Sequence, residues 1–223
     1  MKNQTVKSLL VLTLATGLAT ETFAQKIHQK KSPLRTEVLQ KINPISGNVK
    51  EWVFNQDFVY DGFYLETNAE KYLVKFPIHL GAELRNSISN NPIVVQGVVK
   101  YSPLGEKEIE LVSLKTPNKV IYNLPPETPT NVLEKKFVNN SGKIKEVQIN
   151  EMGDPIGFIL EDRTVLRLPK HLSKQLSNLA PQGSTISYTG IEKSKDNGEA
   201  YYNNYSVVRC NTITIGEDQY LIK

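Results

Sequence analysis

The sequence has one cysteine in 223 residues, and this scarcity excludes several kinds of site. An intramolecular disulfide, a zinc site built from cysteines and a CxxC redox motif each need more than one thiol. Cys210 follows Val207 and Val208 in a run typical of a strand, so we expect a buried, unreactive thiol. The stability of the fold must then come from apolar packing.

The short motifs that mark common enzyme sites are also missing. There is no G-x-S-x-G, no H-E-x-x-H and no phosphate-binding glycine loop. His79 and His171 have no histidine or cysteine nearby at a metal-binding spacing. Nothing in the sequence brings two carboxylates to the separation that glycoside hydrolysis requires. We therefore expect a protein that is not an enzyme and that uses no metal and no cofactor.

Basic residues are in small excess, with a formal net charge of +4. Much of this excess lies in residues 25–43, where five basic residues accompany one acid: Lys26, Lys30, Lys31, Arg35, Lys41 and Glu37. The rest of the chain is close to neutral. A nucleic-acid-binding domain is expected to carry a clustered basic surface, because counterion release from phosphates dominates its affinity. The charge distribution therefore disfavours a nucleic-acid ligand without excluding one.

Long apolar runs are absent after residue 24, so we expect no membrane span in the mature chain. Residues 1–24 have the pattern of a signal peptide: Lys2 and Lys7 precede an uncharged stretch, and Thr22-Phe23-Ala24 offers a small-x-Ala cleavage site. A membrane-spanning helix is the alternative, but it needs about 20 predominantly apolar residues. We expect an exported protein, periplasmic or secreted, in which residues 25–45 form a basic leader.

An internal repeat organises the remaining chain. Residues 46–51 (SGNVKE) return at 141–146 (SGKIKE), and 62–66 (GFYLE) return at the same offset as 157–161 (GFILE). After a shortening of the second copy, 76–80 (FPIHL) correspond to 168–172 (LPKHL), and 95–98 (VQGV) to 188–191 (YTGI). Duplication of one module explains this order. We expect a first module at 46–115 and a second at 138–223.

The segment between the two copies, residues 116–137, contains four prolines. They are Pro117, Pro125, Pro126 and Pro129. Proline has no backbone N–H to donate to a sheet and favours an extended backbone. We therefore expect a stiff linker here rather than strands.

Apolar periodicity in the second copy predicts its elements. Phe158 and Leu160 share one face of a strand while Ile159 lies on the other, and leucines recur at helical spacing between Pro169 and Pro181. The predicted order is β-β-β-α-β-β. Its elements cover residues 144–149, 157–161, 164–168, 171–179, 185–192 and 205–215.

This order, with the S-G-x-I, G-F-x-L-E and V-L-R-L-P patterns and the leucine-rich helix, resembles small bacterial OB-fold proteins, some of them exported. The OB-type barrel has five strands, and the resemblance places a helix between strands 3 and 4. We predict a mainly β protein with two tandem five-stranded OB-type barrels, each with that short helix. Proteins of this shape bind nucleic acid, sugars or other proteins, so the resemblance leaves the ligand open.

Aromatic residues are concentrated in the first module. OB barrels bind ligands on strands 2 and 3, where stacking contributes about 1 to 3 kcal/mol per base. The candidate ligand-binding residues are Trp52, Phe58, Tyr60, Tyr64, Tyr72 and Lys75. The alternative is that Trp52 and Phe54 fill the barrel or the contact between modules. A second cluster, Tyr201, Tyr202 and Tyr205 with Asn203 and Asn204, is polar enough for a hairpin tip.

The favoured function is a non-enzymatic binding or scaffolding protein of the cell envelope. In this hypothesis the first module contacts an envelope protein, a glycan or an oligonucleotide, and the second stabilises or presents it. The alternative is a single-stranded nucleic-acid-binding protein, against which export and the nearly neutral body count. An envelope hydrolase is the least favoured, because it lacks any motif.

Overall fold

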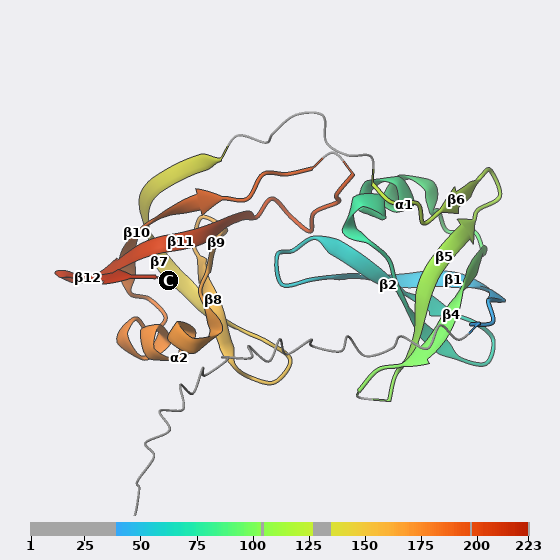
Figure 1. The fold of residues 1–223 in the computed structure, drawn as a ribbon, viewed down its shortest axis with the longest axis horizontal. Helices are drawn as coiled ribbons and strands as arrows, with labels where there is room; N and C mark the ends of the chain where they lie inside the picture. Colours follow the sequence, from blue (N-terminus) through green and yellow to red (C-terminus); the bar gives the residue numbers. More distant parts are fainter. Residues whose placement is uncertain (1–38, 104, 127–134, 197, 223) are drawn as a thin grey trace, which may run out of the picture. The chain divides into compact units, whose positions relative to one another are not determined.

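The computed structural model describes residues 39–103, 105–126, 135–196 and 198–222 (Figure 1). The expected signal peptide and most of the basic leader lie outside these residues. Gln40–Lys223 form one compact unit. Among the described residues, no helix has the length and apolar character needed to cross a membrane.

The first barrel is built from five strands that close on themselves. Strand β1 pairs antiparallel with β2 and β4, β2 with β3, and β4 with β5, and a parallel pairing of β3 with β5 completes the ring. A 3-10 turn and a short helix separate β3 from β4. The elements are β1 (Asn43–Phe54), β2 (Tyr60–Glu66), β3 (Lys71–Lys75), η1 (Ile78–Leu80), α1 (Gly81–Ser87), β4 (Ile93–Tyr101) and β5 (Lys107–Lys115).

The second barrel repeats this connectivity strand by strand. Its closing pair is the parallel one between β9 and β11, and α2 lies between the third and fourth strands. The elements are β7 (Lys136–Ile149), β8 (Pro155–Leu160), β9 (Thr164–Arg167), α2 (Lys170–Leu179), β10 (Thr185–Glu192) and β11 (Ser206–Ile215). The prediction of two five-stranded barrels, each with a short helix between strands 3 and 4, is confirmed.

Each barrel carries one more strand than the periodicity predicted. β6 (Val120–Tyr122) pairs with β5, and β12 (Asp218–Leu221) pairs with β11. β6 lies within residues 116–137, for which we expected only a linker. Pro117 does not prevent this, because it lies in a turn: the Thr116 hydroxyl accepts the N–H groups of Asn118 and Lys119, and the sheet resumes beyond it.

The repeated glycines mark the same bend in both copies. Gly97 and Gly190 lie at β-bulges, where a side-chain methyl would come within 2.4 Å of the Glu110 carbonyl oxygen and 2.3 Å of the Arg209 carbonyl oxygen, respectively. No residue with a Cβ fits so close to a neighbouring strand, so glycine is required at both positions. The correspondence of 95–98 with 188–191 therefore reflects equivalent geometry.

Each barrel has its own apolar core, and the inward residues of the repeat supply it. Phe63, Leu65 and Leu84 are fully buried in the first, and Phe158 and Leu160 in the second. Leu176 of α2 covers the second core, and Leu84 of α1 has the same role in the first. The cores leave the outward faces of the strands free to differ.

Cys210 lies in the core of the second barrel, and burial raises the pKa of its thiol to about 12. A thiol reacts as its thiolate, so this group is both inaccessible and protonated at neutral pH. We expect Cys210 not to react with Ellman's reagent in the folded protein and to react fully in concentrated guanidinium chloride. Full reaction under native conditions would show that the second barrel opens readily.

Candidate functional site

The loops that join the first two strands of each barrel share one scaffold. The side-chain oxygen of Asn55 accepts the N–H groups of Asp57 (2.9 Å) and Val59 (3.2 Å). The side-chain oxygen of Asn150 likewise accepts those of Met152 (3.0 Å) and Asp154 (2.8 Å). The first-barrel loop, residues 55–59, is called the β1–β2 loop below. Since these hydrogen bonds correspond, the difference between the two loops lies at their tips.

The tip of the β1–β2 loop carries an aromatic residue in a glycine conformation. Phe58 has a φ of 58°, and the second loop has Gly153 at a φ of 80°. The left-handed region costs a residue with a Cβ about 1 to 2 kcal/mol. Contacts of the Phe58 side chain must offset this cost.

Those contacts come from the second barrel. The Phe58 ring is 8% exposed, stacks on the ring of Tyr205 at 3.9 Å between centroids, and packs against three aliphatic side chains: Ile159, Val165 and Val207. The three lie side by side across β8, β9 and β11. This outward row is called the Ile159 row. Its Ile159 and Val165 lie on strands 2 and 3 of the second barrel, where OB barrels hold ligands, and its Val207 lies on strand 5.

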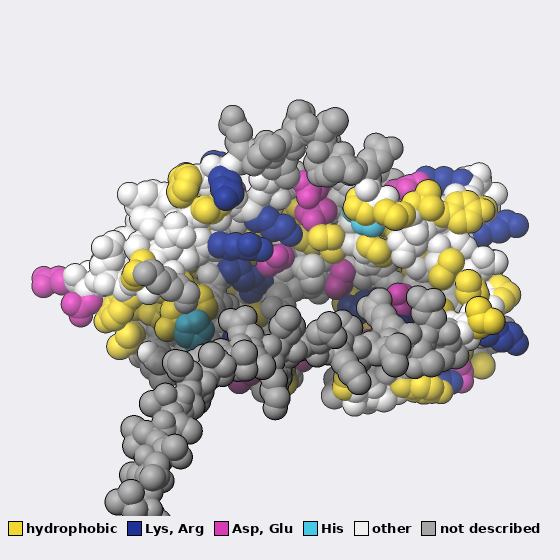
Figure 2. Space-filling model, viewed as in Figure 1, with side chains coloured by type: hydrophobic (Ala, Val, Ile, Leu, Met, Phe, Trp, Pro, Cys, Tyr) yellow, Lys and Arg dark blue, Asp and Glu magenta, His cyan; other side chains and the backbone are white. Residues whose placement is uncertain are grey.

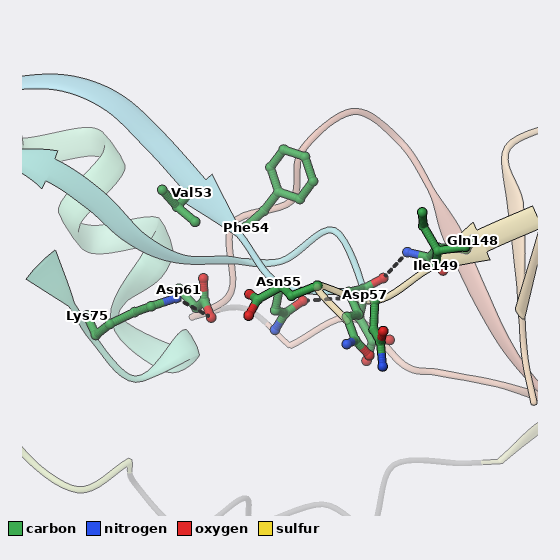
Figure 3. A pocket seen from close by; sticks show the side chains of 11 residues that line it. Val53, Phe54, Asn55, Asp57, Asp61, Lys75, Gln148 and Ile149 are labelled. Atoms are coloured by element: carbon green, nitrogen blue, oxygen red, sulfur yellow. Dashed lines mark hydrogen bonds and ion pairs between the residues drawn. The ribbon is translucent and has the colours of Figure 1, made fainter. Parts of the chain in front are cut away.

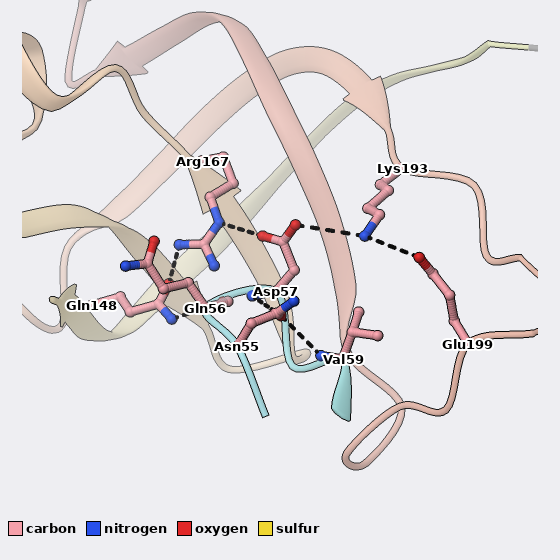
Figure 4. Close-up of polar contacts among 8 residues, drawn as sticks. All are labelled: Asn55, Gln56, Asp57, Val59, Gln148, Arg167, Lys193 and Glu199. Atoms are coloured by element: carbon pink, nitrogen blue, oxygen red, sulfur yellow. Dashed lines mark hydrogen bonds and ion pairs between the residues drawn. The ribbon is translucent and has the colours of Figure 1, made fainter. Parts of the chain in front are cut away.

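Charged groups surround the same contact (Figure 4). The Asp57 carboxylate accepts a hydrogen bond from Arg167 Nε at 2.7 Å and lies 3.6 Å from Lys193 Nζ. Arg167 Nη1 donates to Gln148 Oε1 at 2.6 Å, while Gln148 Nε2 donates to the Gln56 carbonyl at 3.0 Å. Arg167 Nη2 is buried and has no hydrogen-bond partner among the described residues. The β1–β2 loop therefore presents a carboxylate and a ring to matching groups of the second barrel.

The second barrel contributes a loop of its own to this contact. In the β10–β11 loop, residues 193–205, the Ala200 carbonyl accepts the Tyr60 N–H at 2.9 Å, and the Tyr202 N–H donates to the Phe58 carbonyl at 2.8 Å. The Tyr202 ring stacks on Phe54 at 4.5 Å between centroids. The tyrosine cluster expected at a hairpin tip does lie in a strand connection, but it packs against the first barrel.

The corresponding face of the first barrel has a different surface. There Tyr64, Leu73 and Glu108 occupy the positions of Ile159, Val165 and Val207 in the strand register. This set is called the Tyr64 row. Lys71 Nζ lies 3.7 Å from the centre of the Tyr64 ring. Burial, followed by the nearby carboxylates of Glu106, Glu51 and Glu108, raises the pKa of Tyr64. Within the described part of the chain, Tyr64 stacks with no other ring.

Three candidate residues do not lie on an open face. Trp52 is half-buried and makes edge contacts with Tyr60, Phe63 and Phe76 of the first core. Tyr60 is buried in that core, and the Arg85 guanidinium lies 4.8 Å from the ring centres of both Trp52 and Tyr60. Phe58 is buried against the Ile159 row. Trp52 and Tyr60 thus pack in the first barrel, and Phe58 contacts the second barrel.

The other three candidates remain partly exposed on the first barrel. Tyr64 lies on β2 in the Tyr64 row. Lys75 lies on β3, with its Nζ 3.4 Å from the Asp61 carboxylate. The Tyr72 hydroxyl donates to Glu70, which also pairs with Lys107. Hydrogen bonding by Lys107 and then by Tyr72 lowers the pKa of Glu70. Tyr72 packs against the first core, so Tyr64, Lys71 and Lys75 are the candidate groups left on the outward face of strands 2 and 3.

A cleft of about 590 Å³ lies next to the β1–β2 loop (Figure 3). Its lining is mostly polar and includes Asp61, Lys75 and Gln148. The Phe54 ring points away from these polar side chains, and it stacks on Tyr202 instead. Asp61 Oδ1 is buried without a hydrogen-bond partner among the described residues. Among the described residues that line the cleft, Phe54 is the one aromatic, and its ring is already stacked.

Acidic and basic side chains lie near one another on the visible face of the molecule (Figure 2). On the first barrel, Lys100 pairs with Glu110, Lys119 with Glu83 at 2.9 Å, and Lys50 with Glu66 at 3.3 Å. Ion pairs between exposed side chains contribute little to stability. Their effect here is to leave few uncompensated positive charges on this barrel.

Sequence reasoning missed the residues of the second barrel that hold the loop: Arg167 as an ion-pair partner of Asp57, and Ile159, Val165 and Tyr205 as a ring pocket. Two signals were present. Ile159 and Val165 are apolar at outward strand positions, which indicates a covered outer face. Phe58 replaces Gly153 in the aligned copy, and a large ring at a glycine position of a turn needs a specific contact.

Comparisons with known proteins add little beyond this geometry. No protein-family model matches the chain, and no curated protein matches it. Among solved structures, the p204 HINb domain is 14% identical over 77% of this chain and 98% of its own, with a TM-score of 0.25. A single-stranded DNA binding protein from Thermus aquaticus is 10% identical over 80% of this chain and 93% of its own, also with a TM-score of 0.25. Scores this low carry no argument, and the OB-type assignment depends on the strand order.

Proposed function

We propose that this chain is a non-enzymatic binding or scaffolding protein in which the first barrel contacts a ligand and the second barrel holds the first. One asymmetry supports the proposal. Phe58 covers the Ile159 row. In the Tyr64 row, by contrast, the tyrosine is partly exposed and has lysines beside it. The ligand face of one barrel is thus used for assembly, and that of the other stays available.

The chemistry of the Tyr64 row favours a protein as the ligand. Tyr64 and Leu73 form a small apolar centre, with Lys71 and Lys75 two residues to either side of Leu73 on β3 and the carboxylates of Glu106, Glu51 and Glu108 near the Tyr64 ring. A tyrosine surrounded by charges of both signs is typical of protein interfaces, in which aromatic anchors lie inside a polar rim. Because residues 1–24 have the pattern of a signal peptide, we propose that the partner is a protein of the cell envelope.

Single-stranded nucleic acid is the second candidate, because Tyr64 and two lysines lie on the face that OB barrels use for bases and phosphates. The neighbouring glutamates would repel phosphates and weaken such binding. A titration with a fluorescent mixed-sequence oligonucleotide at low and at physiological salt separates the two ideas. Tight binding that falls steeply with salt would support nucleic acid. No binding at low salt would exclude it.

The proposal is tested with the chain without residues 1–24 as bait for envelope proteins of its source cell. We expect Tyr64→Ala to weaken binding of the retained partner by about tenfold or more, because truncation of an anchoring tyrosine costs about 2 kcal/mol. Tyr122→Ala is the matched control, since Tyr122 is an exposed tyrosine of the same barrel on β6, away from the Tyr64 row. Equal retention of the partner by both variants would reject the proposed face.

A further inference from the structure

We infer that the Ile159 row, with Arg167, Lys193 and Tyr205 around it, is a receptor site for a peptide segment with a carboxylate next to an aromatic ring. In this structure the β1–β2 loop occupies the site through Asp57 and Phe58. An external segment with the same two groups would compete with the loop. The inference concerns the second barrel and does not depend on the proposed role of the Tyr64 row.

The site has the parts of a ligand pocket rather than of a uniform contact surface. Three aliphatic side chains form an apolar floor, and the Tyr205 ring covers one face of the inserted ring at an interplanar angle of 11°. Two cations converge on one carboxylate at the edge of this floor. A binding pocket is typically mostly apolar, with a few polar groups that fix the orientation of its ligand.

The loop is an imperfect occupant of this pocket. An arginine binds a carboxylate most strongly through two parallel hydrogen bonds. Asp57 uses only Arg167 Nε, and the buried Nη2 is left without a partner in the described structure. Phe58 reaches the floor only by adopting a left-handed backbone. A separate peptide is not tied to β1 and β2. It can therefore pair with both nitrogens of Arg167 and place its ring without a left-handed backbone, so its contacts with the site can be more favourable than those of the loop.

The composition of the floor selects a peptide over a nucleotide. A nucleotide would offer a phosphate and a flat base to the same groups. The polar edges of that base would then face Ile159, Val165 and Val207, none of which offers a hydrogen bond. Burying polar groups without partners is unfavourable. A phenyl ring has no polar edge, as Phe58 itself demonstrates.

The loop and an external peptide compete for one site, so their affinities are linked. The apparent affinity of the peptide is proportional to the fraction of molecules whose site is empty, so it falls as the loop fills the site. Phe58→Gly empties the ring pocket and places glycine where the backbone is left-handed, as in the second copy. Asp57→Asn is a milder change that keeps the ring and weakens the ion pair. Both variants are therefore expected to bind external peptide better than the wild type.

The probe is a fluorescein-labelled peptide with the sequence of residues 53–61 (VFNQDFVYD), titrated by anisotropy into the full chain. We expect Phe58→Gly to bind it at least about tenfold more tightly than the wild type, with Asp57→Asn between them. Adding Arg167→Gln to Phe58→Gly should remove most of this gain. Phe54→Ala is the matched control, because it removes a neighbouring ring and leaves the pocket occupied.

Two results would overturn the inference: no gain in either Phe58→Gly or Asp57→Asn, or a gain that persists after Arg167→Gln. Tighter binding of a single-stranded oligonucleotide than of the peptide by Phe58→Gly would overturn the assignment to peptides. If Phe58→Gly does not fold, Asp57→Asn still decides the outcome. Tyr64→Ala should leave peptide binding unchanged, so failure of this inference and failure of the proposed function are read separately.

Discussion

Replacing Phe58 by alanine is expected to lower the free energy of unfolding by about 3 kcal/mol, within the usual range for loss of a buried phenylalanine ring. The ring is almost fully buried between Tyr205 and the Ile159 row, so truncation leaves a cavity between the barrels. Phe58→Gly should cost about 1 kcal/mol less than Phe58→Ala, because glycine adopts a φ of 58° without strain. Glycine normally destabilises more than alanine, so the reversal identifies the backbone contribution.

Urea denaturation measures this prediction, with Trp52 fluorescence reporting on the first barrel and far-ultraviolet circular dichroism on both. We expect one coincident transition in the wild type and separate transitions in Phe58→Ala, because the ring couples the two cores. Phe54→Ala should cost clearly less, since Phe54 is 36% exposed and only stacks on the rim of the contact. A loss below about 1 kcal/mol for Phe58→Ala would contradict the burial of this ring in solution.

Replacing Arg167 by glutamine is expected to lower the free energy of unfolding by about 2 kcal/mol. The Arg167 and Asp57 side chains are 16% and 31% exposed, so their interaction is only partly screened by water. Removing one partner leaves a carboxylate whose remaining cation, Lys193, is 3.6 Å away. Breaking a fully buried pair costs about 3 to 5 kcal/mol, and partial exposure reduces this value.

A double-mutant cycle with Asp57→Asn isolates the pairwise energy, for which we expect about 1 to 2 kcal/mol. Lys50 and Glu66 provide the matched control: their nitrogen and oxygen lie 3.3 Å apart, but the side chains are 58% and 52% exposed. The control pair should couple by less than about 0.5 kcal/mol and lose most of that in high salt. Equal coupling energies in the two cycles would mean that Arg167 and Asp57 are as hydrated as a surface pair.

The two barrels were predictable because the sequence patterns that indicate their strands and helices are local and occur in both copies. Alternation around Phe158 and Leu160 indicates a strand with one buried face, and the leucine spacing after Pro169 indicates a helix. The same patterns in the first copy, with glycines at matching bulges, leave few folds open. The short strands β6 and β12 escaped prediction, because three or four residues beyond a turn carry too little periodicity to be recognised.

The candidate site was predictable only in part. The concentration of aromatics in the first module is visible in the sequence. The sequence does not distinguish a ring that awaits a ligand from one that fills a neighbouring barrel. Tyr64 and Phe58 were both candidates, and the structure places one on a partly open face and buries the other.

Sequence alone thus determined that two like β-rich modules follow one another with the aromatics in the first, since composition, repeat and periodicity are properties of neighbouring residues. Tertiary structure decided what those aromatics contact. Asp57 and Arg167 are 110 positions apart, and Phe58 meets a pocket built from three strands of the other module. Such a contact depends on the closure of both barrels, which no local pattern records. The two modules share a scaffold, but the outward row that is partly open in the first module is, in the second, covered by the β1–β2 loop of the first.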